Sequence, residues 1–413
     1  MRCYTHFLRI LLFSLLLSSC IIIDFESDST PERKYKAERL WRREIFGYIA
    51  FDSPPLVTGS YCYFYTYDLG KVVKINLETG KVLWESAWIN GLYQQPQKIG
   101  EYIYQPSTSG TITVLDDANG NRAASIGLAG NTMYYKNYAV ASGEYLFWSN
   151  YPYTSSETRG LMRLDTTKID FSEDPYTVQT VIQELVWSDG ETGIAVQLLV
   201  EDGIVYFINR SGVLIALDAE IGTVLWERAT SYDEIKPRFA LALHDEKILV
   251  ITKNMSCYNK LTGEFIFEIT ELDNADIHFD KLRFTVHNNI LYYIVNYGAT
   301  VTAVNLDTGK ILWSKNAYSH CKNNYNYDGY VDCLCSGRHY YRPLAHVYGD
   351  ALFIMSDSGL RVYNADKGTF IGVDKTLIMD IDYSVLYNDT LVFLGDYPDK
   401  TTASGYVTAI RCK

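Results

Sequence analysis

Three eleven-residue segments of this chain follow one pattern, and this repeat constrains the fold more than any other feature of the sequence. Each segment has Asp or Asn at its third position, Gly at its seventh and Trp at its eleventh, over residues 74–84, 216–226 and 303–313. Weaker copies start at residues 114, 163, 257, 362 and 409. The starting positions lie 40 to 59 residues apart, which indicates a fold built from eight equivalent units.

Each copy of the pattern is typical of a β-hairpin. Residues 212–217 are an apolar strand, Asp/Asn-x-x-Thr-Gly is turn chemistry because Gly readily adopts positive φ, and Val-Leu-Trp begins the next strand. Upstream apolar segments such as residues 203–208 bring each unit to about four strands. The sequence therefore predicts an all-β fold, a closed eight-bladed β-propeller of four-stranded antiparallel blades. The expected turn glycines are Gly80, Gly120, Gly222, Gly263, Gly309 and Gly368.

The two ends of the repeat region complement each other. The last copy, residues 409–411, stops before its Trp strand, whereas Trp41 near the start has no copy of the pattern before it. We therefore expect the N-terminal strand to complete the last blade. The propeller would then span residues 38–413 and leave no terminal blade edge exposed.

The repeat resembles that of the pyrroloquinoline quinone (PQQ) propellers, Ala-x-Asp-x-x-Thr-Gly-x-x-x-Trp, over about residues 38–413. The family includes quinoprotein dehydrogenases and also cofactor-free, BamB-like lipoproteins of outer-membrane protein assembly. The resemblance alone does not choose between these functions. It implies that the repeat indoles dock on the neighbouring blade, which gives this structural role to Trp41, Trp84, Trp226 and Trp313.

The first residues have the features of an export signal. Arg2 and Arg9 form a basic flank, residues 10–17 a short apolar core, and Leu17-Ser-Ser-Cys20 resembles the lipobox of bacterial lipoproteins. We expect residues 1–19 to be removed, Cys20 to be lipidated, and residues 20–37 to form a lipidated N-terminus and tether. An ordinary secretory signal is the alternative. Ile21 is not the Asp that favours inner-membrane retention, so an outer-membrane anchor facing the periplasm is preferred.

The charge of the chain limits its partners. Removing Arg2 and Arg9 from the 37 Lys and Arg leaves 35 against 49 Asp and Glu, a formal charge of −14. This charge argues against nucleic acid and anionic lipid surfaces as partners, and the membrane is expected to be reached through the N-terminal lipid only. The propeller itself is expected to be a monomeric ring that binds protein partners of the cell envelope.

No motif of a catalytic centre stands out. The chain has no Cys-Cys pair of the alcohol-oxidising quinoproteins, no Cys-x-x-Cys-His, no Gly-x-Ser-x-Gly and no His-Glu-x-x-His. The repeat Asp and Asn recur once per unit, which is typical of turn residues. We predict no catalytic residue, no metal and no cofactor. The His residues in or beside predicted strands, interpreted as packed or solvated, are His244, His278, His287 and His346.

The long segment after Trp313 holds the remaining candidates. Cys321, Cys333 and Cys335 favour a disulfide in an exported chain, with zinc binding or free thiols as alternatives. Aromatic side chains there and in a second loop are candidate partner surfaces, because Tyr is favoured in interfaces; they are Tyr151, Tyr153, Tyr325, Tyr327 and Tyr330.

The sequence thus favours a non-catalytic envelope scaffold over two alternatives. The leading hypothesis is a lipid-anchored, BamB-like ring that presents loops to protein partners. A propeller that binds a small ligand such as a saccharide is the first alternative. A PQQ-dependent dehydrogenase is the second.

Overall fold

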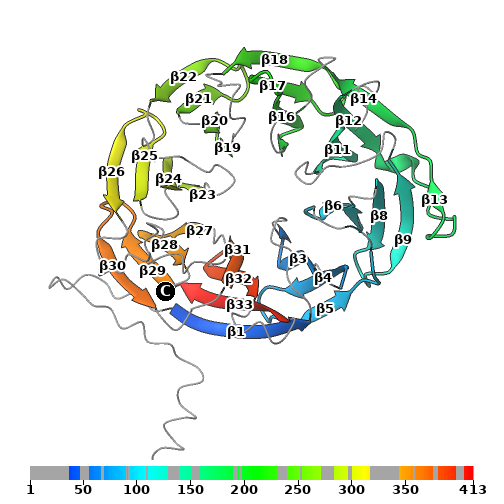
Figure 1. Ribbon diagram of the computed structural model, residues 1–413, viewed down its shortest axis with the longest axis horizontal. Coiled ribbons are helices and arrows are strands. Elements are labelled where there is room, and N and C mark those ends of the chain that lie inside the picture. Colours follow the sequence, from blue (N-terminus) through cyan, green and yellow to red (C-terminus); the bar gives the residue numbers. More distant parts are fainter. Residues whose placement is uncertain are drawn as a thin grey trace, which may run out of the picture.

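A computed structural model of the chain has eight sheets arranged around a ring (Figure 1). The structure describes residues 37–46, 55–66, 69–89, 91, 94–107, 110–128, 139–150, 159–188, 194, 198–230, 240–251, 254–270, 283–295, 300–316, 344–356, 359–374, 380–396 and 404–412. Every sheet contains four antiparallel strands, and one sheet gains a fifth. The predicted eight-bladed β-propeller is confirmed.

The first four blades take up the N-terminal half of the ring. Blade 1 comprises β2 (Leu56–Thr58), β3 (Tyr61–Thr66), β4 (Lys71–Asn76) and β5 (Val82–Glu85). Blade 2 comprises β6 (Gln97–Ile99), β7 (Tyr102–Pro106), β8 (Thr111–Asp116) and β9 (Arg122–Gly127). Blade 3 comprises β10 (Val140–Ser142), β11 (Tyr145–Asn150), β12 (Gly160–Asp165) and β14 (Gln183–Trp187). Blade 4 comprises β15 (Leu199–Glu201), β16 (Ile204–Ile208), β17 (Val213–Asp218) and β18 (Val224–Ala229).

The other four blades complete the ring. Blade 5 comprises β19 (Ala240–His244), β20 (Lys247–Ile251), β21 (Met255–Asn259) and β22 (Phe265–Ile269). Blade 6 comprises β23 (Arg283–His287), β24 (Ile290–Val295), β25 (Thr300–Asn305) and β26 (Ile311–Asn316). Blade 7 comprises β27 (Leu344–Tyr348), β28 (Ala351–Ser356), β29 (Gly359–Asn364) and β30 (Phe370–Asp374). Blade 8 comprises β31 (Asp380–Tyr387), β32 (Thr390–Asp396), β33 (Ser404–Cys412) and β1 (Ala37–Phe46).

The position of a strand within its blade explains its sequence. The third strand of a blade is covered on both faces by the neighbouring blades, so it carries a continuous apolar run. In β17, four consecutive residues, 214–217, are buried. The outermost strand is half-exposed instead, and in β18 only Trp226 is buried. The core of the protein therefore lies between the blades, in clusters to which two neighbouring blades contribute.

The N-terminal strand closes the ring. β1 pairs with β33 in antiparallel register, with Trp41 opposite Ala409, and a β-bulge lies between Arg39 and Trp41. In Figure 1 the blue β1 runs along the red β33 at the outer rim of blade 8. Trp41 and Ile45 then pack with apolar residues of both blade 8 and blade 1. The predicted completion of the last blade is confirmed.

Blade 3 departs from the regular pattern. Between β12 and β14 the chain forms a 3₁₀ helix, η1 (Thr166–Lys168), and a short strand, β13 (Val178–Gln179), which pairs in parallel with β9 of blade 2. The copy of the repeat that starts at residue 163 has Ile169 where six other copies have Gly, and the chain does not turn back there. Residues 166–182, called the blade-3 insertion below, project from the rim beside blade 2 (Figure 1).

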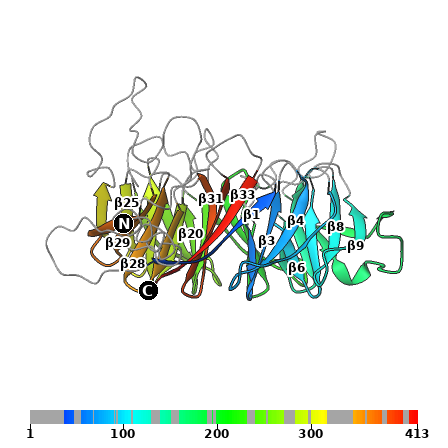
Figure 2. The same cartoon turned by 90° about the horizontal axis from the view of Figure 1, so that it is seen from below.

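Seen from the side, the blades stand next to one another in a single layer, and the blade-3 insertion extends beyond β9 at the edge (Figure 2). Among the residues that the structure describes, no helical segment has the length and apolar character that crossing a membrane requires.

Candidate functional site

The repeat Trp residues join neighbouring blades. The indole Nε1 of Trp41, Trp84, Trp226 and Trp313 donates to a backbone carbonyl of the next blade, that of Leu77, Asp117, Lys260 and Ala365 respectively, at 2.8 to 3.1 Å. Each of these carbonyls belongs to the residue directly after the repeat Asp or Asn. The indole of the repeat Trp is therefore engaged in a contact between two blades.

The repeat Gly serves both the turn and the junction. All six turn glycines have φ between +64° and +76°. A Cβ built on Gly263 would lie 2.6 Å from the ring of Trp226, and one on Gly80 would lie 2.4 Å from the ring of Trp41. A side chain at either position would therefore strain the backbone and displace the indole.

The repeat Asp and Asn side chains cap the same turns. The Oδ1 of Asn76 accepts from the backbone N–H of Thr79 at 2.9 Å, and the Oδ1 of Asp218 accepts from that of Ile221 at 2.9 Å. These oxygens are therefore used locally, as in other Asx turns.

An Arg two residues after the Trp strengthens two of the junctions. Arg43 Nε donates to the carbonyl oxygen of Gly80 at 3.0 Å, and Arg228 Nε donates to that of Gly263 at 2.8 Å. The sequence interpretation missed this contact. Its signal is the Trp-x-Arg spacing, present at Trp41 and Trp226 and absent at Trp84 and Trp313.

Two eroded copies of the repeat keep the junction with other residues. In blade 5, Phe267 replaces the indole and lies against Gly309, 2.7 Å from a built Cβ. In blade 3, Val186 lies against Gly222, and Arg163 Nη1 donates at 3.1 Å to the carbonyl of Ala219. That carbonyl is equivalent to the acceptors of the indoles. A guanidinium therefore takes over the hydrogen bond of the missing Trp.

A partly buried ion-pair cluster lies between blades 1 and 2. Asp117 Oδ1 accepts from Lys74 Nζ and Tyr63 Oη, each at 2.7 Å, and Lys98 Nζ pairs with Asp117 Oδ2. Burial disfavours the charge of Asp117, but hydrogen bonds from Lys74, Lys98 and Tyr63 outweigh burial, so the pKa of this carboxyl lies below its usual value. The cluster is structural, because it closes a junction in the same way as the indole of Trp84, which contacts the same residue.

We predict that Asp117→Asn lowers the free energy of unfolding at pH 7 by about 1–3 kcal/mol, because Lys74 and Lys98 lose their counter-charge. The folded-state pKa of Asp117 is depressed, so its stabilisation is present above the unfolded pKa of about 3.9 and is lost as pH falls through the folded value. Denaturant unfolding of both proteins should show the difference at pH 7 and lose it at strongly acidic pH. A difference that persisted unchanged in acid, or that Asp174→Asn on the surface reproduced, would contradict this assignment.

The described His and Cys residues lie in strands or their turns. His346 Nε2 lies 2.6 Å from Ser384 Oγ, and this contact joins the inner strands of blades 7 and 8. Burial lowers the pKa of the His346 imidazole to about 4. His244 ends β19 and His287 ends β23.

Cys62 and Cys257 are buried free thiols, and burial raises the pKa of Cys257 to about 12. Within the described residues, no group of three or more His, Cys, Asp or Glu is placed to hold a metal ion.

The blade-3 insertion is held firmly against blade 2. Phe171 stacks on Tyr102 with ring centroids 4.2 Å apart and an interplanar angle of 7°. Ser125 Oγ donates to the carbonyl of Pro175 at 2.7 Å. The guanidinium of Arg122 lies 4.8 Å from the ring centre of Tyr176. Together with the parallel pairing of β13, these contacts place the insertion on the outer edge of the neighbouring blade.

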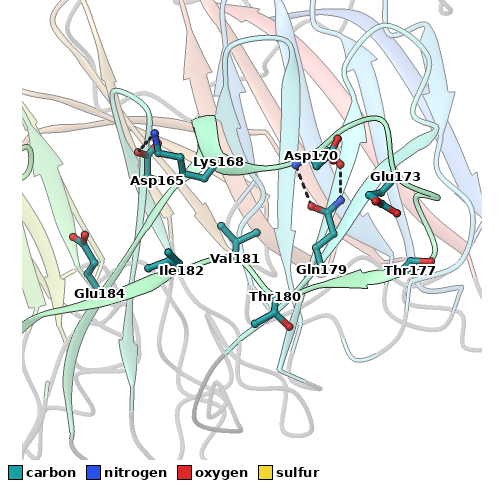
Figure 3. A pocket seen from close by; sticks show the side chains of 10 residues that line it. All are labelled: Asp165, Lys168, Asp170, Glu173, Thr177, Gln179, Thr180, Val181, Ile182 and Glu184. Carbon is teal, nitrogen blue, oxygen red and sulfur yellow. Dashed lines mark hydrogen bonds and ion pairs between the residues drawn. The ribbon is translucent and has the colours of Figure 1, made fainter.

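A groove of about 620 Å³ runs between the two arms of the insertion (Figure 3). Gln179 bridges the arms, because its Oε1 accepts from the backbone N–H of Asp170 at 3.1 Å and its Nε2 donates to the carbonyl of the same residue. The lining residues, which we call the insertion groove, are Asp165, Lys168, Asp170, Glu173, Thr177, Gln179, Thr180, Val181, Ile182 and Glu184.

The insertion groove is acidic. It contains four carboxylates and one Lys. Hydrogen bonds from Thr167 to Asp165 and from Ser172 to Asp170 lower the pKa of both carboxyls, so both are charged at neutral pH. A second hollow of about 760 Å³, between blades 3 and 4, shares Asp165 and adds four further carboxylates, those of Glu144, Asp202, Asp218 and Glu220. The negative surface therefore continues beyond the insertion.

Large apolar side chains are exposed on the same insertion. Ile182 is 80% exposed, Tyr176 64% and Val178 54%. Ile169 and Val181, from the two arms, are buried instead, in the core between blades 2 and 3. The insertion thus combines a fixed backbone, apolar side chains and carboxylates. The sequence interpretation did not find this surface, although the interval of 53 residues between the copies at 163 and 216 shows that this unit carries extra chain.

Several predicted residues lie outside the described part of the chain. These are the signal at residues 1–19, the tether below residue 37, and Cys20, Tyr151, Tyr153, His278, Cys321, Tyr325, Tyr327, Tyr330, Cys333 and Cys335. The predicted lipidation, disulfide and Tyr surfaces stay predictions.

Solved structures of differently named proteins share this fold. BamB from Moraxella catarrhalis has a TM-score of 0.60 at 16% identity, over 91% of this chain and 97% of that one. The designed protein Ika8 has 0.59 at 13%, over 89% and 98%. A quinohemoprotein alcohol dehydrogenase from Comamonas testosteroni has 0.59 at 11%, over 91% and 76%. At these identities the likeness shows the fold alone.

Sequence comparison identifies the family. No curated protein gives a match. The family model described as Outer membrane protein assembly factor BamB matches residues 35–226 and 183–369, which together take in most of the ring. The chain therefore belongs to the BamB family of outer membrane protein assembly factors.

Proposed function

We propose that this protein is a non-catalytic lipoprotein of the cell envelope, whose propeller is a scaffold for protein partners in outer-membrane protein assembly. The family match supports this proposal, because the family is described as an outer membrane protein assembly factor. The observation that carries it is the surface of the blade-3 insertion. Its exposed Ile182, Tyr176 and Val178 stand next to a groove, as expected of a site that binds another protein.

The repeat residues support a scaffold as well. The indoles, the turn glycines and the Asp or Asn side chains of the repeat are engaged in turns and blade junctions. A rigid ring of this kind orders its outer surface in advance, which lowers the entropic cost of binding a partner.

Affinity purification from native membranes, after chemical cross-linking and with mass spectrometry, tests the proposed function. We expect an outer-membrane β-barrel protein or its assembly machinery to be enriched with the full-length protein. The absence of any enriched envelope protein would contradict a scaffold. Quinone-dependent dye reduction by the purified protein would contradict a non-catalytic role.

We predict that Cys20→Ala releases the protein from the membrane and leaves the propeller folded. The reason is that acyl chains on this residue would be the membrane anchor, and the ring would need none of them to fold. Fractionation of cells should move the protein from the membrane pellet to the soluble fraction or leave it as an unprocessed precursor. A fully processed Cys20→Ala protein that still sedimented with membranes would refute lipidation as the anchor.

A further inference from the structure

The insertion groove is bordered by two strand edges that pair with no further strand among the described residues. β13 is the last strand of the blade-2 sheet, and β14 is the last strand of the blade-3 sheet. The two strands are separated by Thr180, Val181 and Ile182 only. Natural proteins usually protect an exposed strand edge with Lys, Pro or a covering loop. Here Val178 of β13 is 54% exposed and Ile182, in the link between the strands, is 80% exposed, so apolar side chains lie exposed beside these edges.

The charges beside these edges indicate which kind of protein segment can bind there. Lys168 is the only cation among the groove residues, and it lies 3.8 Å from Asp165. Glu184 pairs with Arg163. Within the described part of the chain, Asp170 and Glu173 have no ion-pair partner. These two exposed carboxylates can therefore pair with cations of a partner. Asp170 Oδ1 also accepts from Ser172 Oγ at 2.7 Å.

Resting on the proposed scaffold function, we infer that the insertion groove binds an extended segment of a partner protein that carries alternating basic and apolar residues. The segment adds its backbone to the edge of β13 or β14, as peptides do in β-strand addition. Because side chains of a strand alternate between its faces, one face of the segment contacts Ile182 and Val178. Its Lys or Arg residues pair with Asp170 and Glu173.

The parallel pairing of β13 with β9 shows that this rim accepts an added strand. The insertion itself binds blade 2 in this way, with Val178 opposite Ser125 and Gln179 opposite Ile126. A partner strand would extend the sheet by one further step at the same place. The remaining anchors of the insertion, such as Phe171 on Tyr102, keep that edge in position.

A fluorescent peptide of alternating Lys and Val, with a peptide of alternating Glu and Val as its counterpart, tests this inference by fluorescence anisotropy on the full chain. We expect the Lys-Val peptide to bind with an affinity that falls as salt rises. Methylation of its backbone nitrogens should abolish binding, because strand addition needs the N–H groups. Equal binding of the Glu-Val peptide, or undiminished binding of the methylated peptide, would overturn the inference.

Surface variants locate the binding. Ile182→Ser and Glu173→Lys should each weaken the affinity about ten-fold, which corresponds to about 1.4 kcal/mol. The matched controls on blade 5 are Leu261→Ser, at a residue that is 51% exposed, and Glu264→Lys, and they should leave the affinity unchanged. All four changes are at exposed positions, so circular dichroism should show intact folding. Equal effects of the control variants would overturn the inference, as would a dimer of the protein that Ile182→Ser dissociates.

The two proposals fail in different ways. Native cross-linking could enrich envelope proteins while Ile182→Ser leaves that enrichment and the peptide affinity unchanged. In that case the proposed binding in the insertion groove is wrong and the proposed scaffold function is retained. If the parent protein enriches no envelope protein, the scaffold is wrong whatever the peptide does.

Discussion

Deleting residues 38–46 is expected to cost the protein its cooperative unfolding and to cause aggregation. These residues form most of β1, which supplies the fourth strand of blade 8 and leaves the edge of β33 exposed when it is removed. The deletion also removes Trp41 and Ile45 from the core between blades 8 and 1. The hydrogen bonds of Trp41 to Leu77 and of Arg43 to Gly80 are lost as well. Light scattering during thermal unfolding, together with the slope of denaturant unfolding, measures both effects.

A deletion of residues 21–34 is the control for this experiment. It shortens the chain ahead of β1 and leaves every β1–β33 pair in place, so the midpoint of unfolding should hardly change. A protein without residues 38–46 that was monomeric and had the same unfolding midpoint as the parent would show that β1 does not hold the ring closed.

The blade count and the closure of the ring could be predicted because both depend on a local, repeated signal. An Asp or Asn turn, a Gly that needs positive φ and a Trp four residues later lie within eleven residues, so one window of sequence specifies a whole hairpin. The orphan Trp41 and the truncated copy at 409–411 then complement each other, and the pairing of Trp41 with Ala409 follows that logic.

The candidate site could not be predicted in the same way, because it depends on contacts between distant parts of the chain. β13 is two residues long and pairs with β9, more than fifty residues earlier in the sequence. No periodicity identifies so short a strand. The role of Arg163 could not be predicted either. Arg163 stands at the first position of an eroded copy, and that position does not indicate that its guanidinium replaces an indole N–H as a donor.

The polar clusters between blades were hidden for a different reason. Lys74 occupies the first position of its copy, where Ala216 and Ala303 stand in the other strong copies. Its neighbours in space, Asp117 and Tyr63, become partners only after blades 1 and 2 are packed together. The spacing of residues along one blade carries no information on such pairs. The strands and turns of each blade can therefore be predicted from the sequence more readily than the contacts between blades.

Trp226→Ala is expected to lower the free energy of unfolding by about 3–5 kcal/mol, the range for removing a large buried aromatic side chain. Trp226 is 7% exposed, donates to the carbonyl of Lys260 at 3.1 Å and covers Gly263, so its loss leaves a cavity and an unpaired carbonyl at the junction of blades 4 and 5. Denaturant unfolding followed by tryptophan-independent circular dichroism measures the change.

Two matched variants separate docking from the mere loss of a Trp. Trp88 is 62% exposed, so Trp88→Ala should change the free energy of unfolding far less than Trp226→Ala. Trp226→Phe should fall between them, because it keeps a ring over Gly263, as Phe267 does over Gly309, and loses the hydrogen bond, worth about 1 kcal/mol. If all three variants were equally stable, the repeat Trp would not hold the blades together, and the ring would depend on strand pairing and apolar packing alone.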